Sequence, residues 1–272
     1  MRIDSHQHFW RVSRGDYGWL TPELGPIHRD FLPQDLTPLL KAHGIDRTVV
    51  VQAAPSEAGS AFLLDLASRT PFVAGVVGWV DFEAPDARES ITRLAQRPAL
   101  VGLRPMIQDL AEDEWMMRET LVPAIETMIE TGLCFDALVK PRHLRTLKAF
   151  AQRFPRLPVV IDHGAKPDIA GGALESWARG IEPLSREPNV ACKLSGLATE
   201  ASSKWTPADL APVLRRDDRR LRSAAVDVGQ RLAGAQPEWR LPGLVLRGAD
   251  ADGQSERCGP GLASRRRSRK VL

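Results

Sequence analysis

Apolar and β-branched residues recur in short runs along the first 200 residues of this chain, and longer amphipathic stretches separate the runs. A near-continuous run such as 158–161 is typical of a strand buried on both faces of a sheet. Apolar positions repeated every three or four residues indicate helices that cover such a sheet. Seven strands are predicted: the opening residues as far as 8, then 48–51, 72–80, 100–104, 133–139, 158–163 and 189–195. Helices are predicted between them at 35–42, 58–68, 86–96, 119–131, 141–153 and 174–185.

The alternation of strands and helices predicts the fold class. Strand–helix–strand repeats are typical of a parallel α/β sheet. Seven such units in a chain of 272 residues favour a (β/α)8 TIM-type barrel over an open sheet. No GxGxxG motif follows a predicted strand, which argues against a dinucleotide-binding fold.

Polar residues lie where the predicted strands end. The active site of such a barrel is built at the C-terminal ends of its strands, so these residues form a candidate site. They are His6, His8, Gln52, Asp81, Arg104, Asp136, Lys140, His163, Lys193 and Ser195.

The first of these strands ends in a His-x-His pair. Alternate residues of a strand share a face, so His6 and His8 point the same way, and Asp4 points with them. Two imidazoles on one face can bind one divalent ion. The alternative is a surface strand with two solvated histidines.

The apolar runs and the cysteines indicate in which cellular compartment the protein is expected. The chain has no apolar run of 18 residues, so no membrane-spanning helix is expected. Its three cysteines, Cys134, Cys192 and Cys258, form no CxxC motif. This spacing is typical of a reducing compartment and predicts a cytoplasmic protein.

Five segments together resemble a known family. They read DSHQHFW at 4–10, HRDFLPQDL at 28–36, GLRP at 102–105, DHGAKP at 162–167 and CKLSGL at 192–197. In this order they resemble the amidohydrolase-2 branch of the amidohydrolase superfamily, and within it the sugar-lactone hydrolases of the L-fuconolactonase and L-rhamnonolactonase type. The resemblance covers about residues 1–212.

The resemblance implies a distorted (β/α)8 barrel that opens a sugar lactone to an aldonic acid, a reaction of carbohydrate metabolism. It implies one divalent metal, zinc or manganese, at His6 and His8, and a catalytic histidine at His163. The histidine usual after strand five is replaced in this chain, where Asp136 is the candidate oxygen ligand. Some family members work without a metal, in which case the histidine pair binds substrate.

A small-molecule substrate is the expected partner, and five residues are expected to bind it. Trp10 offers a flat apolar face to a sugar ring, with core packing as the alternative. For Arg104 the alternative is an ion pair with Asp81 or Asp136. The five expected residues are Trp10, His28, Arg104, Lys166 and Lys193.

Residues 213–272 differ in composition from the rest of the chain. They hold 14 Lys and Arg against 7 Asp and Glu, whereas the first 212 residues hold 23 against 27. The Asp-Trp-Pro motif that the family places after strand eight, with its catalytic Asp, is absent. We therefore divide the chain into a barrel at 1–212, with its eighth strand missing or degraded, and an Arg-rich tail at 213–272.

Three explanations of the tail stay open. It is the product of a reading-frame shift near residue 212, a divergent segment with a new role, or a disguised eighth strand at 244–250 with Asp250 as the base. Without the strand-eight carboxylate, weak or no lactonase activity is expected.

Two other functions compete with the lactonase. A decarboxylase of the same fold would act on an aromatic or muconate-type acid. A non-catalytic protein would bind a polyanion through its basic tail, although the tail has one aromatic residue, Trp239, and no recognisable nucleic-acid-binding module. Nucleic acid and membrane partners are therefore not expected.

Overall fold

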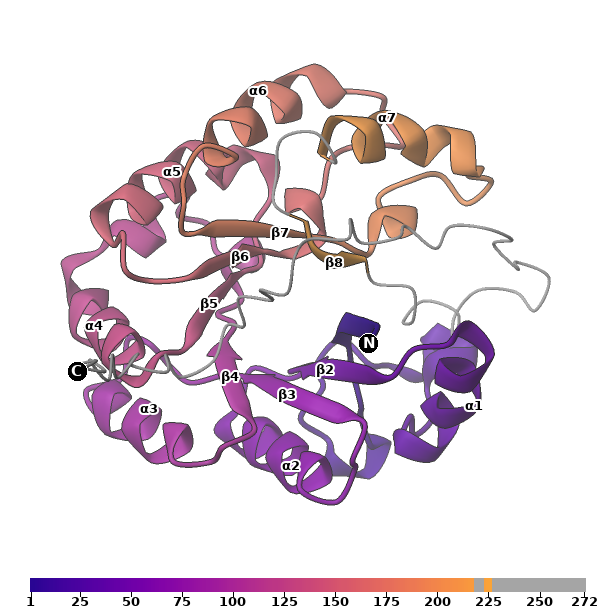
Figure 1. Cartoon of the computed structure of the whole chain (residues 1–272), viewed down its shortest axis with the longest axis vertical. Helices are drawn as coiled ribbons and strands as arrows, with labels where there is room; N and C mark the ends of the chain where they lie inside the picture. The colour runs from indigo at the N-terminus through magenta and orange to yellow at the C-terminus, as the bar shows by residue number, and fades with distance from the viewer. Residues whose placement is uncertain (218–222, 227–272) are drawn as a thin grey trace, which may run out of the picture.

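Parallel strands form a single barrel-like sheet in the computed structural model, which describes residues 1–217 and 223–226. The strands are hydrogen-bonded in the order in which they occur along the chain. Helices surround them on the outside (Figure 1), so the predicted (β/α) barrel is confirmed. The strands are β1 (Ile3–Gln7), β2 (Arg47–Val51), β3 (Val73–Gly78), β4 (Leu100–Leu103), β5 (Cys134–Ala137), β6 (Val159–Ile161), β7 (Val190–Leu194) and β8 (Ser223–Val226).

The predicted helices are also present, with shifts of a few residues at their ends. They are α1 (Pro33–His43), α2 (Glu57–Ala67), α3 (Ala87–Ala95), α4 (Val122–Thr131), α5 (Leu144–Arg153) and α6 (Leu174–Leu184), and a further helix, α7 (Pro207–Asp217), follows β7. Among the described residues no helix is long and apolar enough to cross a bilayer.

Local signals in the sequence account for the helix ends. The Asp35 carboxylate accepts the Leu32 N–H at 2.9 Å at the start of α1, and Ser56 Oγ accepts the Gly59 N–H at 2.9 Å at the start of α2. Both bonds satisfy N–H groups that a helix leaves unpaired in its first turn. Gly44 ends α1 with φ +63°, a left-handed conformation that glycine adopts without strain.

One large apolar core joins the strands to the helices around them. Val50, Val76, Leu103, Phe135 and Ile161 carry it from strand to strand. Trp10, Tyr17, Leu20, Phe31 and Ala54 form a smaller cluster, which we call the aromatic cluster. Most of its members belong to the loop between β1 and α1, where Trp10 and Phe31 pair as an isolated antiparallel bridge.

The C-terminal region differs in part from the expectation of a missing strand. Helix α7 continues past the boundary expected at residue 212, and β8 pairs in parallel with β7 through Cys192 to Ser223 and Leu194 to Val226. The eighth position therefore holds a strand of four residues, none of them acidic. The alternative strand at 244–250, with Asp250, and the remainder of the tail lie outside the described residues.

Candidate functional site

His6 of β1 and His8, just after that strand, lie together at the C-terminal end of the barrel strands. His6 is buried and His8 is half-buried, and their Nε2 atoms are 3.3 Å apart. His8 Nδ1 lies 2.8 Å from the Val51 carbonyl oxygen, to which an N–H at this atom donates. Donation there leaves the His8 Nε2 lone pair facing His6.

The spacing of these two nitrogens fits a single metal ion. Two nitrogens bound at 2.0–2.1 Å to one tetrahedral zinc ion lie about 3.3 Å apart. A histidine ligand commonly donates its other N–H to a backbone carbonyl, as His8 does to Val51. Burial lowers the pKa of His6 well below its usual value, although Asp162 acts in the opposite direction. A neutral imidazole is the form that binds a metal.

The end of β6 brings an acid, Asp162, and a third histidine, His163, to the site. After Ile161 the chain turns through left-handed backbone, with φ +56° at His163, +60° at Ala165 and +54° at Lys166. Non-glycine residues adopt this conformation at a cost, and such segments persist where their surroundings hold them. Trp177 of α6 holds this turn by donating its indole N–H to the Gly164 carbonyl at 2.6 Å.

Strand β7 fixes the orientation of the His163 ring. Ser195 Oγ lies 2.7 Å from His163 Nδ1, and both residues are buried. The next residue must be small, because a Cβ at Gly196 would lie 2.7 Å from the same nitrogen. Gly196 also has φ +61°, so glycine is favoured there on two counts.

These elements converge on one point. His6, Asp162 and His163 each offer a ligand atom, and the three atoms lie within 4.8 Å of one another. The His6 and His163 ring centroids are 4.4 Å apart. We call His6, His8 and His163 the histidine group.

Four charged side chains from neighbouring strand ends meet beside it, and we call them the ion-pair group. Lys193 contacts Asp136 and lies 3.1 Å from Asp162 Oδ1. Arg104 NH1 lies 3.3 Å from Asp162 Oδ2, and another of its nitrogens donates to the Gln52 carbonyl. All four are buried, so two cations balance two carboxylates within the protein.

The charges of the ion-pair group shift its acids in opposite directions. Burial alone would raise the pKa of Asp162, but Lys193, His6 and Arg104 together hold it well below its usual range. Burial raises the pKa of Asp136 to about 6, against the pull of Lys193. Burial would lower the pKa of Lys193, but Asp136 and Asp162 raise it, so Lys193 is protonated at neutral pH.

Asp136 is engaged in an ion pair at this site. The sequence offers it as the oxygen ligand, but Lys193 binds its carboxylate and it is not one of the three residues that converge. Asp162 is one of those three. Sequence reasoning missed it, although the signal was present: an acid directly before His163 at the end of an apolar strand.

The structure separates the expected substrate residues. Arg104 and Lys193 lie beside the histidine group, and Arg104 pairs with Asp162 rather than with Asp81 or Asp136. Trp10 is 6% exposed, packs 4.6 Å from the Phe31 ring and donates its indole N–H to the Arg29 carbonyl. Its faces are therefore covered by protein, and the core-packing alternative describes it.

The other two expected substrate residues lie in loops. Lys166 Nζ is 3.4 Å from Glu200 Oε1, so its charge already has a partner. His28 is half-buried and follows a short 3-10 segment, η2 (Pro22–Ile27), where its N–H binds the Gly25 carbonyl.

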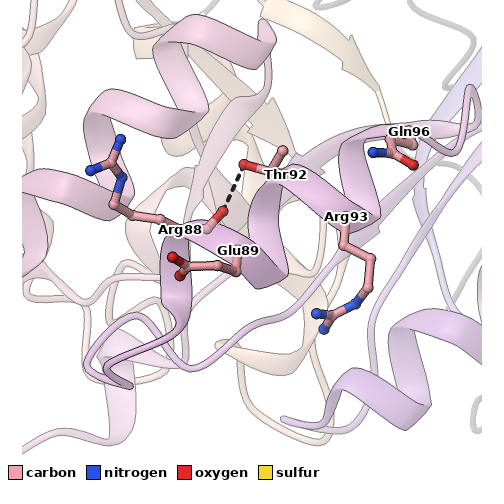
Figure 2. Close-up of a pocket in the computed structure, with 5 residues that line it drawn as sticks. All are labelled: Arg88, Glu89, Thr92, Arg93 and Gln96. Atoms are coloured by element: carbon pink, nitrogen blue, oxygen red, sulfur yellow. Dashed lines mark hydrogen bonds between the residues drawn. The ribbon is translucent and has the colours of Figure 1, made fainter.

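A hollow on the outer surface of α3 has no part in this site. Arg88, Glu89, Thr92, Arg93 and Gln96 line it (Figure 2). Their side chains project from one helix, and Arg93 is paired with Glu57 at 2.6 Å. None of the strand-end residues lines it.

Comparison with known proteins places the chain in a family. Residues 3–219 match the amidohydrolase family. The chain belongs to this family. It is 55% identical over 200 residues to an L-fucono-1,5-lactonase of Burkholderia ambifaria, across 74% of this chain and 69% of that protein.

Two further relatives agree with this assignment. An L-fucono-1,5-lactonase of Burkholderia multivorans is 36% identical over 233 residues, across 84% of this chain and 77% of the relative. A solved amidohydrolase of Burkholderia multivorans with bound zinc superposes with a TM-score of 0.77 at 34% identity and covers 87% of each chain.

Proposed function

We propose that this amidohydrolase hydrolyses a sugar 1,5-lactone to an aldonic acid, with L-fucono-1,5-lactone as its reference substrate. The observation that carries the proposal is the convergence of His6 and His8 at the barrel end of a chain 55% identical to a protein named for that reaction. Water adds to the lactone carbonyl carbon, the bond to the ring oxygen breaks, and that oxygen takes up a proton.

His6 and His8 are the proposed metal ligands, and zinc is the proposed ion. A relative of the same family was crystallised with zinc. Asp162 offers a ligand atom within 4.8 Å of His6 and is the proposed oxygen ligand. A divalent ion bound there supplies a Lewis acid and lowers the pKa of a water molecule.

His163 is the proposed proton carrier. Ser195 Oγ lies 2.7 Å from its Nδ1 and orients the ring beside His6 and Asp162. Strand β8 offers no acid within its four described residues, so His163 is proposed for the role of the carboxylate that the family places after strand eight. Asp162 holds a negative charge beside His6 and His163.

Arg104 is the proposed contact to a substrate oxygen. Its Nε is buried and has no hydrogen-bond partner among the described residues, whereas its terminal nitrogens are bound by Asp162 and by the Gln52 carbonyl. Lys193 stays protonated between two carboxylates and keeps the site neutral overall. A decarboxylase would need an arginine ready to clamp a substrate carboxylate, and Arg104 is already clamped by one.

The test is lactone hydrolysis with and without metal. Zinc-loaded protein is expected to speed the opening of L-fucono-1,5-lactone, followed by acid release, and chelation is expected to remove that activity. His6→Ala and His8→Ala are expected to abolish it, whereas His43→Ala, at the exposed end of α1, is the matched control. Full activity in both site variants would refute the proposal.

The activity level is a second part of the proposal. Because general acid–base help contributes about 10²–10⁴ in rate, we expect this chain to be slower than a chimaera whose residues after 212 come from the Burkholderia ambifaria lactonase. Equal rates would show that the family carboxylate is not needed in this chain.

A further inference from the structure

The loop between β1 and α1 presents an exposed tryptophan, Trp19, in the segment that follows His8. Among the described residues, the large hydrophobic side chains left exposed are Met1, Trp19 and Leu24, at 80, 42 and 41%. Trp19 lies in the segment that follows His8, and loops after barrel strands line the mouth of the site.

Trp19 is anchored to the same segment that orients His8. Its indole N–H donates to the Ala53 carbonyl at 2.7 Å, and His8 Nδ1 contacts the Val51 carbonyl two residues earlier. The indole of Trp19 and the ring of His8 are therefore both held by carbonyls at the end of β2.

The ring is held before any ligand arrives. It packs edge-to-face against Trp10, at 5.6 Å between centroids and 80° between planes, and against Tyr17, at 6.4 Å and 72°. The Tyr17–Leu20 turn is closed by a hydrogen bond of 2.9 Å, and Ser56 ties the loop to α2 through Asp16. A ring fixed in this way loses little conformational entropy on binding.

We infer that Trp19 is the aromatic platform on which the sugar ring of the substrate stacks, and that buried Trp10 is its support. This inference rests on the proposed function. The ligand class is a pyranose-type lactone, or its aldonic acid, with an apolar C–H face for the indole and hydroxyl groups for the polar strand ends. Trp19 has the two properties that such a contact needs and Trp10 lacks: an exposed ring and an N–H already satisfied by protein.

Kinetics of Trp19→Ala test the inference. Stacking that is equal in the ground state and the transition state affects binding alone, so KM should rise about fivefold to tenfold with kcat within about twofold. Trp19→Phe should recover most of the loss. Leu24→Ala is the matched control, because Leu24 is equally exposed in the same loop. An unchanged KM in Trp19→Ala would overturn the inference.

A binding measurement separates this inference from the proposed function. L-fuconate should change the tryptophan fluorescence of the zinc-loaded wild type, and the change should be lost in Trp19→Phe and kept in Leu24→Ala. A wild type that neither binds L-fuconate nor opens the lactone would overturn the proposed function. A wild type that does both, with an identical fluorescence change in Trp19→Phe, would overturn the role of Trp19 alone.

Discussion

The histidine group and the ion-pair group lie side by side at one end of the same barrel, yet they are built for different tasks. The rings of His6, His8 and His163 lie close together, and burial favours the neutral form of His6. The charged side chains of the ion-pair group neutralise one another, since Lys193 and Arg104 pair with the carboxylates of Asp136 and Asp162. A cluster of polar strand ends is therefore not one site. We propose metal binding for the histidine group and the adjoining Asp162.

The largest effect should come from breaking the ion-pair group. Lys193→Met leaves two buried carboxylates with one cation, and removing one partner of a buried ion pair costs about 3–5 kcal/mol. Urea denaturation should show this loss in the free energy of unfolding, and Lys193→Met/Asp136→Asn should regain part of it. Exposed Lys204→Met is the control and should change little. A loss no greater than that of Lys204→Met would contradict the buried network.

A second substitution acts on the turn that orients His163. Gly196→Ala forces a left-handed alanine whose Cβ would lie 2.7 Å from the His163 ring. We expect a loss of about 1–3 kcal/mol in the free energy of unfolding, together with weaker zinc binding. Gly15→Ala, also at positive φ but with open space around it, is the matched control for the stability loss, and it should leave zinc affinity unchanged.

Ser195→Ala is expected to have a smaller effect, confined to the histidine group. It removes the partner of His163 Nδ1, and loss of such a partner lowers activity about 10–100-fold. Lactone hydrolysis by zinc-loaded protein should show this loss, and Ser195→Thr should restore much of the activity. Equal activity in Ser195→Ala would mean that His163 does not need Ser195 to orient its ring.

The two groups should respond oppositely to mild acid. His6 has a lowered pKa, so its contribution to stability is present above about pH 6.5 and is lost as the pH falls below that. Asp136 has a pKa raised to about 6, so the folded protein binds its proton more tightly and gains stability as the pH falls from about 6 towards 4. Each effect is at most about 1.4 kcal/mol per pH unit.

Asp136→Asn is the variant that separates these contributions. It removes the compensating gain, so its unfolding free energy should fall more steeply than that of the wild type between pH 6 and 4. Parallel curves for the two proteins would show that Asp136 does not titrate in this range.

Sequence patterns predict the barrel well because the strands are apolar on both faces and the helices are amphipathic. The strand at 158–163 and the helix at 174–185 appear nearly as expected, as β6 and α6. The His6 and His8 pair is also foreseeable, since alternation along a strand places both on one face.

What the sequence could not supply is the pairing between strand ends. Asp136 and Asp162 are both acids at the end of strands, and only the three-dimensional arrangement shows that Lys193 binds Asp136 while Asp162 also approaches His6 and His163. Trp10 and Trp19 present the same problem. Both lie in the loop between β1 and α1, and the exposed fraction of each side chain decides which ring a ligand can reach.

Zinc titration of metal-free protein by calorimetry tests the central claim most directly. The account predicts one zinc ion per chain, lost in His6→Ala and His8→Ala and retained in Asp136→Ala. Zinc binding that survives in both histidine variants, or that disappears in Asp136→Ala while the protein stays folded, would contradict it.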